Sequence, residues 1–462
     1  MPRIALKSSL AIAVVSISSL ASGQVVFSDG LTHTIPGDMA FSNGQWISLQ
    51  SASGLNINSG AVANGADGSG NQSSFGGSAI NALAGTSIQQ LGGQVTGGDG
   101  NTNADSFTVS PVSSTGGDGI RTGGSYIGTG GSITGGIGMT EGTYVDGFSV
   151  IVPTEFTEAT GGAALSLTNG ATATLDGVAL TGGESWAYSA QEHVYGYGGP
   201  ALRLNDSGPV TVLSGEFFGG TGNAENFAVN FADATGLGGA CFEVNGSSTL
   251  TIESGTYYGG IGSGVVYFEP EPALGIGAAA IKITGPSTVT VNGGTFNVGS
   301  SASGTLPPAE PLSDFEGTIL VTGDNAAGDM LLTINGGSFN GLYGLETIGT
   351  RPNSLNSRID ILGGNFNGNS FVGDDFDISL SNPDILTTIY GSDFLLDGNP
   401  VSLGLILEEF GTLEGMLADG SNFAWDFERF NNAPLMLAAV PEPTSLALVM
   451  CALPLLRRRR VK

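Results

Sequence analysis

Apolar and polar residues alternate along much of this chain, in short runs separated by glycine-rich turns. The clearest run, STVTVNGGTFNVG at residues 287–299, alternates Thr with Val, turns at NGG and resumes with a phenylalanine. A period of two residues is typical of β-strands rather than helices. Related segments recur at four further places: PVTVLSGEFFGG from Pro209, TLTIESGTYYGG from Thr249, LLTINGGSFNG from Leu331 and RIDILGGNFNG from Arg358.

The second glycine of each turn gives the spacing of these repeats. Successive copies are 40, 39, 43 and 27 residues apart, and apolar residues stand five and three positions before each glycine. An aromatic residue always follows two positions after it, and the five are Phe217, Tyr257, Phe296, Phe339 and Phe366. Since hairpins alone could not bury these side chains, we expect stacked coils that place the five rings in one internal row.

A second glycine pattern precedes each turn by about a dozen residues, as in GGPALRL from Gly198 and GGACFEV from Gly238. Together the two patterns predict an all-β fold, a parallel β-helix of roughly 40-residue glycine-rich repeats. A β-propeller is the alternative, because a four-stranded blade has a similar length. The many short glycine-bounded strands and the lack of Trp-Asp signatures favour the β-helix.

The second pattern also predicts a column of outward-facing side chains, one from each repeat. The column contains Arg121, Ser166, Arg203, Glu243 and Lys282. If each repeat forms one coil, the last three alternate in sign and pair favourably across neighbouring strands. If each repeat forms two coils, the three charges are separated.

Changes in composition divide the chain into four parts. Residues 1–23 have a basic start, an apolar middle and small residues at the end, which is typical of a secretory signal peptide. Residues 24–372 contain the repeats. In residues 373–439 glycine becomes rarer and Asp-Gly turns separate larger apolar residues, which predicts a small antiparallel cap over the open end of the solenoid. Residues 440–462 form a distinct tail.

The net charge of −28 limits the classes of partner. Of 13 basic residues, six lie between the basic clusters at the two ends of the chain. So acidic a body repels nucleic acid, and we expect no nucleic-acid partner. The two cysteines, Cys241 and Cys451, provide no disulfide framework, and we expect Cys241 to pack as a small apolar residue.

The tail combines a Pro-Glu-Pro motif, a 13-residue apolar run from Thr444 to Leu456 and a basic end. The run is short for a stable membrane span, which needs about 20 residues. This order of features resembles the PEP-CTERM protein-sorting domain of Gram-negative bacteria. The residues that carry the resemblance are Pro441, Glu442, Pro443, Arg457, Arg458, Arg459 and Arg460.

The resemblance implies export, transient retention in the inner membrane by a short transmembrane helix, and processing by an exosortase. It also implies delivery to the cell surface or extracellular matrix. An ordinary membrane anchor is the alternative for the tail. The repeats resemble, in general style, the glycine-rich β-helices of autotransporter adhesins.

Catalytic chemistry finds little support in the sequence. No Asp-His-Ser constellation is present, and His33 and His193 are expected to be exposed loop residues. We predict no cofactor. Calcium is the one metal considered, because oxygen ligands suit it. Its candidate ligands are Asp374, Asp375 and Asp377 near the end of the solenoid and Asp67, Asp99 and Asp118 in glycine-rich loops.

One aromatic cluster, Trp186, Tyr188, Tyr195 and Tyr197, is expected either to stack on sugar rings or to pack a long loop against the solenoid. The sequence therefore predicts an exported, non-enzymatic structural or adhesive solenoid, with extracellular polysaccharide as a candidate partner. The alternative is a surface polysaccharide lyase or glycoside hydrolase on the same scaffold. Paired carboxylates in a cleft would favour the enzyme.

Overall fold

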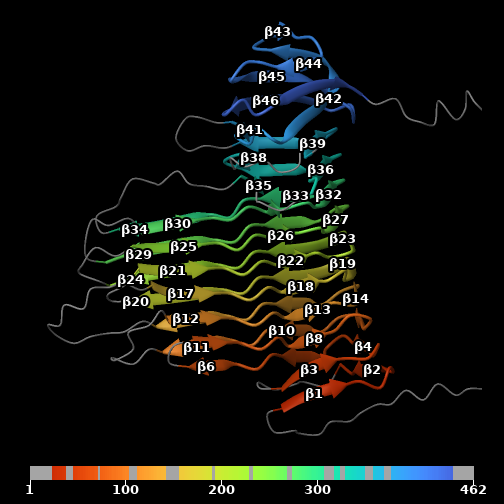
Figure 1. The fold of residues 1–462 in the computed structure, drawn as a ribbon, viewed down its shortest axis with the longest axis vertical. Helices are drawn as coiled ribbons and strands as arrows, with labels where there is room; N and C mark the ends of the chain where they lie inside the picture. The colour runs from red at the N-terminus through yellow and green to blue at the C-terminus, as the bar shows by residue number, and fades with distance from the viewer. Residues whose placement is uncertain are drawn as a thin grey trace, which may run out of the picture.

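The computed structural model describes residues 23–37, 45–70, 73–103, 112–141, 156–189, 193–227, 233–267, 273–305, 317–322, 328–348, 357–368 and 376–440. These residues form 47 strands, and most strand pairs are parallel. The chain coils upward from the red N-terminal strands to the blue C-terminal strands, and a second, flatter lobe projects from the side of the coils (Figure 1). The predicted all-β parallel β-helix is confirmed.

Each complete coil contributes a strand to three faces of the solenoid. Face 1 contains β1 (Gly23–Phe27), β3 (Gln45–Leu49), β8 (Ile80–Ala82), β13 (Ile120–Thr122), β18 (Leu165–Thr168), β22 (Leu202–Asn205), β26 (Phe242–Asn245), β31 (Ile281–Thr284), β35 (Ile319–Thr322), β38 (Leu345–Ile348) and β41 (Ile378–Leu380). Face 2 contains β2 (Thr32–Ile35), β4 (Gly54–Ile57), β9 (Ser87–Gln90), β14 (Ser125–Gly128), β19 (Thr172–Thr181), β23 (Pro209–Phe218), β27 (Thr249–Ile252), β32 (Thr288–Val291), β36 (Leu331–Ile334), β39 (Arg358–Ile361) and β42 (Leu386–Leu396).

Face 3 contains β5 (Val62–Asn64), β10 (Gln94–Thr96), β15 (Ser132–Thr134), the second halves of β19 and β23, β28 (Thr256–Tyr258), β33 (Thr295–Asn297), β37 (Ser338–Gly341) and β40 (Asn365–Gly368). Equivalent residues of successive repeats are direct register partners, as in Val210, Leu250 and Val289. One repeat therefore makes one coil, which decides between the two arrangements that the sequence left open.

The predicted row of aromatic rings runs inside the solenoid. Neighbouring rings of Phe217, Tyr257, Phe296, Phe339 and Phe366 have centroids 4.9 to 5.4 Å apart, and all five side chains are buried. The turn glycines before them adopt positive φ angles, for example 112° at Gly294 and 116° at Gly337, where a side chain would strain the backbone. The recurrent glycine and aromatic residue thus supply the corner of each coil and its core.

The projecting lobe, which we call the arm, was not expected from the sequence. Its outgoing strands are β6 (Gly68–Gly70), β11 (Gly100–Asn103), β16 (Gly138–Glu141), β20 (Ser185–Ser189), β24 (Gly222–Asn226), β29 (Gly262–Val266) and β34 (Ser301–Thr305). Its returning strands are β7 (Ser73–Phe75), β12 (Val112–Thr115), β17 (Phe156–Thr160), β21 (His193–Tyr197), β25 (Ala234–Leu237) and β30 (Ala273–Ile276).

Small residues allow the two arm sheets to lie very close together. Seven Ala and Val side chains form the arm's own apolar core. Towards the N-terminal coils hydroxyl groups replace them, and Thr140 Oγ1 donates a hydrogen bond of 2.7 Å to the carbonyl of Glu158. The arm is absent between β37 and β38, which explains the short interval of 27 residues between the last two repeats.

Paired glycines form the junction between the arm and the solenoid, which we call the neck. Outgoing and returning segments alternate there, joined by one ladder of backbone hydrogen bonds. Gly199 N donates to Gly183 O, Gly220 N to Gly199 O and Gly239 N to Gly220 O, each at 2.8 Å. The ladder extends from Ala66 to Gly299 with N–O distances of 2.7 to 3.0 Å.

Segments packed this closely leave almost no room for side chains, and the ladder contains only glycine and alanine. A Cβ atom at Gly199 would lie 2.1 Å from the carbonyl oxygen of Gly162, and Gly198 is obstructed in the same way by Gly220. Ala278 occupies the last returning position, and its N–O distance of 3.0 Å is the longest in the ladder. The second glycine pattern in the sequence therefore marks the neck.

The cap covers the C-terminal end of the solenoid with β43 (Asn399–Pro400), β44 (Gly404–Ile406), β45 (Phe410–Leu417), β46 (Asn422–Arg429) and β47 (Leu435–Ala439). β45 pairs antiparallel with β42 and β46, as predicted. In addition, β46 and β47 continue the parallel ladders of β41 and β42. Trp425 ends the aromatic row, since its ring meets that of Phe366 edge-on at 4.9 Å.

Replacing Phe296 with Ala should remove one ring from the middle of this row. We expect a loss of about 3–5 kcal/mol in the free energy of unfolding, because the neighbouring coils cannot close the cavity. Thr290→Ala, an outward-facing position in the same coil, is the control and should change it by about 0.5 kcal/mol or less. Urea unfolding followed by tryptophan fluorescence measures both, and equal losses would contradict an internal row.

Replacing Gly199 with Ala should destabilise the protein by about 2 kcal/mol, because the new methyl group must displace the backbone of the preceding coil at Gly162. Gly123→Ala is the milder comparison, since the nearest atom to a Cβ there is Ala84 N at 3.2 Å, which needs to move by only a few tenths of an ångström. Thermal unfolding of the two variants measures the difference. Two variants of equal stability would show that the neck is not closely packed.

Candidate functional site

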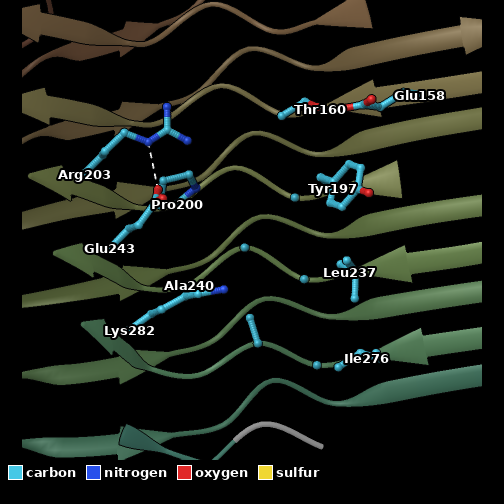
Figure 2. Close-up of a pocket in the computed structure, with 15 residues that line it drawn as sticks. Glu158, Thr160, Tyr197, Pro200, Arg203, Leu237, Ala240, Glu243, Ile276 and Lys282 are labelled. Carbon is cyan, nitrogen blue, oxygen red and sulfur yellow. Dashed lines mark hydrogen bonds and ion pairs between the residues drawn. The ribbon is translucent and has the colours of Figure 1, made fainter. Parts of the chain in front are cut away.

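The described residues form a groove where the arm meets face 1 of the solenoid. It encloses about 390 Å³ and crosses four successive coils. One wall is the outer face of the returning arm strands, the other is face 1, and the floor is the neck with its small residues (Figure 2). The groove exists because glycine and alanine at the neck leave space between the walls.

The wall on the solenoid is the C-terminal part of the column predicted from the sequence, since Arg203, Glu243 and Lys282 line the groove. Arg121, Ser166, Arg203, Glu243 and Lys282 are register partners in that order. The exposure varies along the column: Arg121 is exposed, whereas the small Ser166 between two arginines is buried. The column is therefore confirmed in register, and Ser166 faces outward between the core residues Leu165 and Leu167 although its neighbours cover it.

An ion pair links two coils at the centre of this wall. Arg203 Nε donates to Glu243 Oε2 at 2.8 Å, and each side chain is 29% exposed (Figure 2). Burial alone would raise the pKa of Glu243, but the Arg203 guanidinium, the Asn245 amide and the charge of Lys282 together hold that pKa below its usual value. Glu243 therefore remains a carboxylate.

A second carboxylate, that of Asp118, lies within electrostatic range of the column. Asp118 accepts a hydrogen bond of 3.0 Å from the backbone N–H of Ala163 in the next coil. Burial raises the pKa of Asp118, and the charges of Arg203 and Arg121 and the bond from Ala163 offset only part of this. Positive and negative charges are thus interleaved along the wall.

The opposite wall is mainly apolar. Tyr197, Leu237 and Ile276 are register partners on β21, β25 and β30, and all three line the groove. Burial, with smaller contributions from Glu158 and Tyr195, raises the pKa of Tyr197, so its hydroxyl stays protonated. Glu158 and Thr160 on β17 extend this wall towards the N-terminal coils (Figure 2).

The four residues of the predicted aromatic cluster lie on strands of the arm. The prediction that they belong to a long loop is therefore wrong. Trp186 and Tyr188 lie on the outgoing strand β20 with ring centroids 6.0 Å apart. Tyr195 and Tyr197 lie on the returning strand β21, with centroids 6.4 Å apart. Because the residues between each pair face the arm interior, the two pairs lie on opposite outer faces of the arm.

The predicted calcium ligands within the described residues accept hydrogen bonds from backbone N–H groups. Asp67 accepts from Asp99 N at 2.9 Å, and Asp99 accepts from Ile137 N at 2.8 Å. Asp377 accepts from Gly368 N and Asp426 N where the solenoid meets the cap. Asp374 and Asp375 lie outside the described residues. Among the described residues no three His, Cys, Asp or Glu side chains are grouped to hold a metal ion.

The histidines and the cysteine are explained by packing. His33 lies on β2, buried, 2.9 Å from Asp29 and stacked on Phe27, so the prediction of an exposed loop is wrong for it. His193 is partly exposed but lies on strand β21, so the predicted loop is wrong for it too, and its Nδ1 is 3.4 Å from an Asp233 carboxylate oxygen. Cys241 is buried as predicted, and burial raises the pKa of its thiol.

The sorting residues Pro441, Glu442, Pro443 and Arg457, Arg458, Arg459 and Arg460 lie outside the described residues, which end at Val440. The described part of the chain contains no helix long and apolar enough to cross a membrane. No family model, curated protein or solved structure matches the chain in the three comparisons made.

Replacing Glu243 with Gln should lower stability at neutral pH, because the Arg203 charge loses its partner. The pKa of Glu243 is lowered by folding, so its stabilising effect is present above the usual glutamate pKa of 4.5. The effect is lost as the pH falls through the lower pKa of the folded state. Unfolding midpoints of wild type and Glu243→Gln should thus differ at pH 7 and converge at acidic pH.

The control for this prediction is Glu216→Gln, a change at an exposed glutamate on β23. It should change the midpoint little at either pH. A Glu243→Gln midpoint that stays as far below wild type at pH 3 as at pH 7 would contradict the ion-pair explanation.

Proposed function

We propose that this chain is an exported structural and adhesive solenoid of the cell surface or extracellular matrix. Support comes from the form of its surface, where side chains repeat in columns one coil apart. Asn297, Asn340 and Asn367 form such a column, with side-chain hydrogen bonds of 3.1 and 2.8 Å between neighbours. A long periodic surface suits contact with a polymer that is itself periodic.

The proposed export and sorting to the cell surface are based on the N-terminal and C-terminal segments of the sequence. The signal-peptide pattern of residues 1–23 supports export. The PEP-CTERM resemblance of residues 440–462 supports transient anchoring in the inner membrane and processing by an exosortase-type enzyme. The cap ends at Ala439 and Val440, so the sorting motif begins directly after the last strand. Removal of the tail would leave the described body whole.

A polysaccharide-cleaving enzyme is the second candidate, because Glu158 and Glu243 line one groove. Two points favour the structural role. Glu243 is paired with Arg203, and its lowered pKa opposes the general-acid role that glycoside hydrolysis requires. In addition, the ion pair between Arg203 and Glu243 links two neighbouring coils and so has a structural role. Incubation with candidate polysaccharides and assay of new reducing or unsaturated ends tests the enzyme; sustained turnover would replace the structural proposal.

Mass analysis of the protein from its native host tests delivery. The host is fractionated into inner membrane, cell surface and medium, and the C-terminus of each form is determined. We expect surface and medium forms that lack the tail from about Val440, and Glu442→Ala should accumulate with an intact tail in the membrane. A surface form that retains Lys462 would refute processing. Retention of the wild-type protein inside the cell would refute the proposed function itself.

A further inference from the structure

The two walls of the groove have different chemistry along the same direction. Tyr197, Leu237 and Ile276 form an apolar row on the arm, one residue per coil. Facing them across the neck, Arg203, Glu243 and Lys282 form a charged row with the same repeat (Figure 2). An occupant that follows the groove must therefore be extended, with an apolar side and a hydrogen-bonding side.

The charge balance of the groove further limits the kinds of molecule that could bind there. Three of the six basic residues in the body, Arg121, Arg203 and Lys282, lie in this one column. Each has an acidic neighbour: Glu243 lies between Arg203 and Lys282 in register, and Asp118 lies within electrostatic range of Arg121 and Arg203. The groove thus lacks a positive excess, and the chain around it carries a net charge of −28. A polyanion would be repelled.

We propose that the groove binds an uncharged linear polysaccharide laid along the solenoid axis. Pyranose rings present faces of C–H groups, which pack on aromatic and aliphatic side chains, and a rim of hydroxyl groups. The ring faces lie on Tyr197, Leu237 and Ile276. The hydroxyl groups hydrogen-bond to Arg203, Glu243 and Lys282, where bonds to charged groups are the stronger kind.

The dimensions agree with a polymer rather than with a single sugar. Coils are about 4.8 Å apart, so the four coils of the groove span about 15 Å. The small floor residues Pro200, Ala240 and Ala278 leave the passage open between coils. This inference rests on the adhesive role proposed above and specifies its partner and its binding site.

Affinity electrophoresis of the protein purified from its host tests the proposal. The probes are three uncharged polymers, dextran, mannan and a β-glucan, and two uronate polymers, alginate and polygalacturonate. We expect at least one uncharged polymer to retard the protein, with a similar affinity at about 0.05 and 0.5 M NaCl. The uronates should not bind.

The decisive variants are Tyr197→Ala and its matched control Tyr188→Ala. Both remove a partly exposed tyrosine from the same coil, but Tyr188 lies on the other face of the arm. Tyr197→Ala should weaken binding about tenfold, and Tyr188→Ala less than about twofold. Lys282→Ala tests the charged wall and should weaken binding several-fold. Unchanged thermal unfolding confirms that each variant is folded.

Three results would overturn the inference. They are wild-type protein that binds none of the uncharged polymers, equal losses in Tyr197→Ala and Tyr188→Ala, and uronate binding that salt abolishes. The last would identify an acidic polymer instead. These results can be told apart from failure of the proposed function. A protein that reaches the cell surface but binds no polymer contradicts only this inference. A protein that binds polymer but stays inside the cell contradicts the proposed function.

Discussion

The backbone ladder of the neck is the constraint on which the rest of the structure depends. From Ala66 to Gly299 the chain leaves the solenoid and returns to it in successive coils, and the outgoing and returning segments alternate in one hydrogen-bonded stack. Only residues with almost no side chain fit that stack. The paired glycines are therefore what allows the solenoid to be joined to a thin arm in the coils that carry one.

The groove follows from the same constraint. Because the neck is narrow, the outer face of the arm and face 1 of the solenoid meet at a concave corner, and the parallel register then aligns one residue of each wall in every coil. Parallel stacking turns a repeated sequence position into a column on the surface. Charged residues that are about 40 positions apart in the sequence, such as Arg203, Glu243 and Lys282, therefore lie side by side in one wall of the groove.

The sequence allowed the coils to be predicted in some detail, because the relevant signals repeat. The aromatic row, the charged column and the antiparallel pairing of the cap each depend on period-two alternation or on a turn motif. The arm was missed because the inward-facing positions of its strands are mostly Gly, Ala, Ser and Thr, whose weak hydrophobic pattern is typical of loops. The register of Tyr197 against Leu237 and Ile276 could not be predicted without the arm. Burial of His33 depends on long-range packing that no local pattern records.

Hydrogen–deuterium exchange at the neck tests the central claim most directly. Glycine-rich segments in loops exchange their amide hydrogens quickly, whereas amides in a closed backbone ladder exchange only when neighbouring coils separate. We expect peptides that span Gly198 to Leu202 and Gly238 to Phe242 to be as strongly protected as those of the aromatic row. Rapid exchange at these glycines, with protection retained around Phe296, would show that the arm is only loosely attached and would contradict the account.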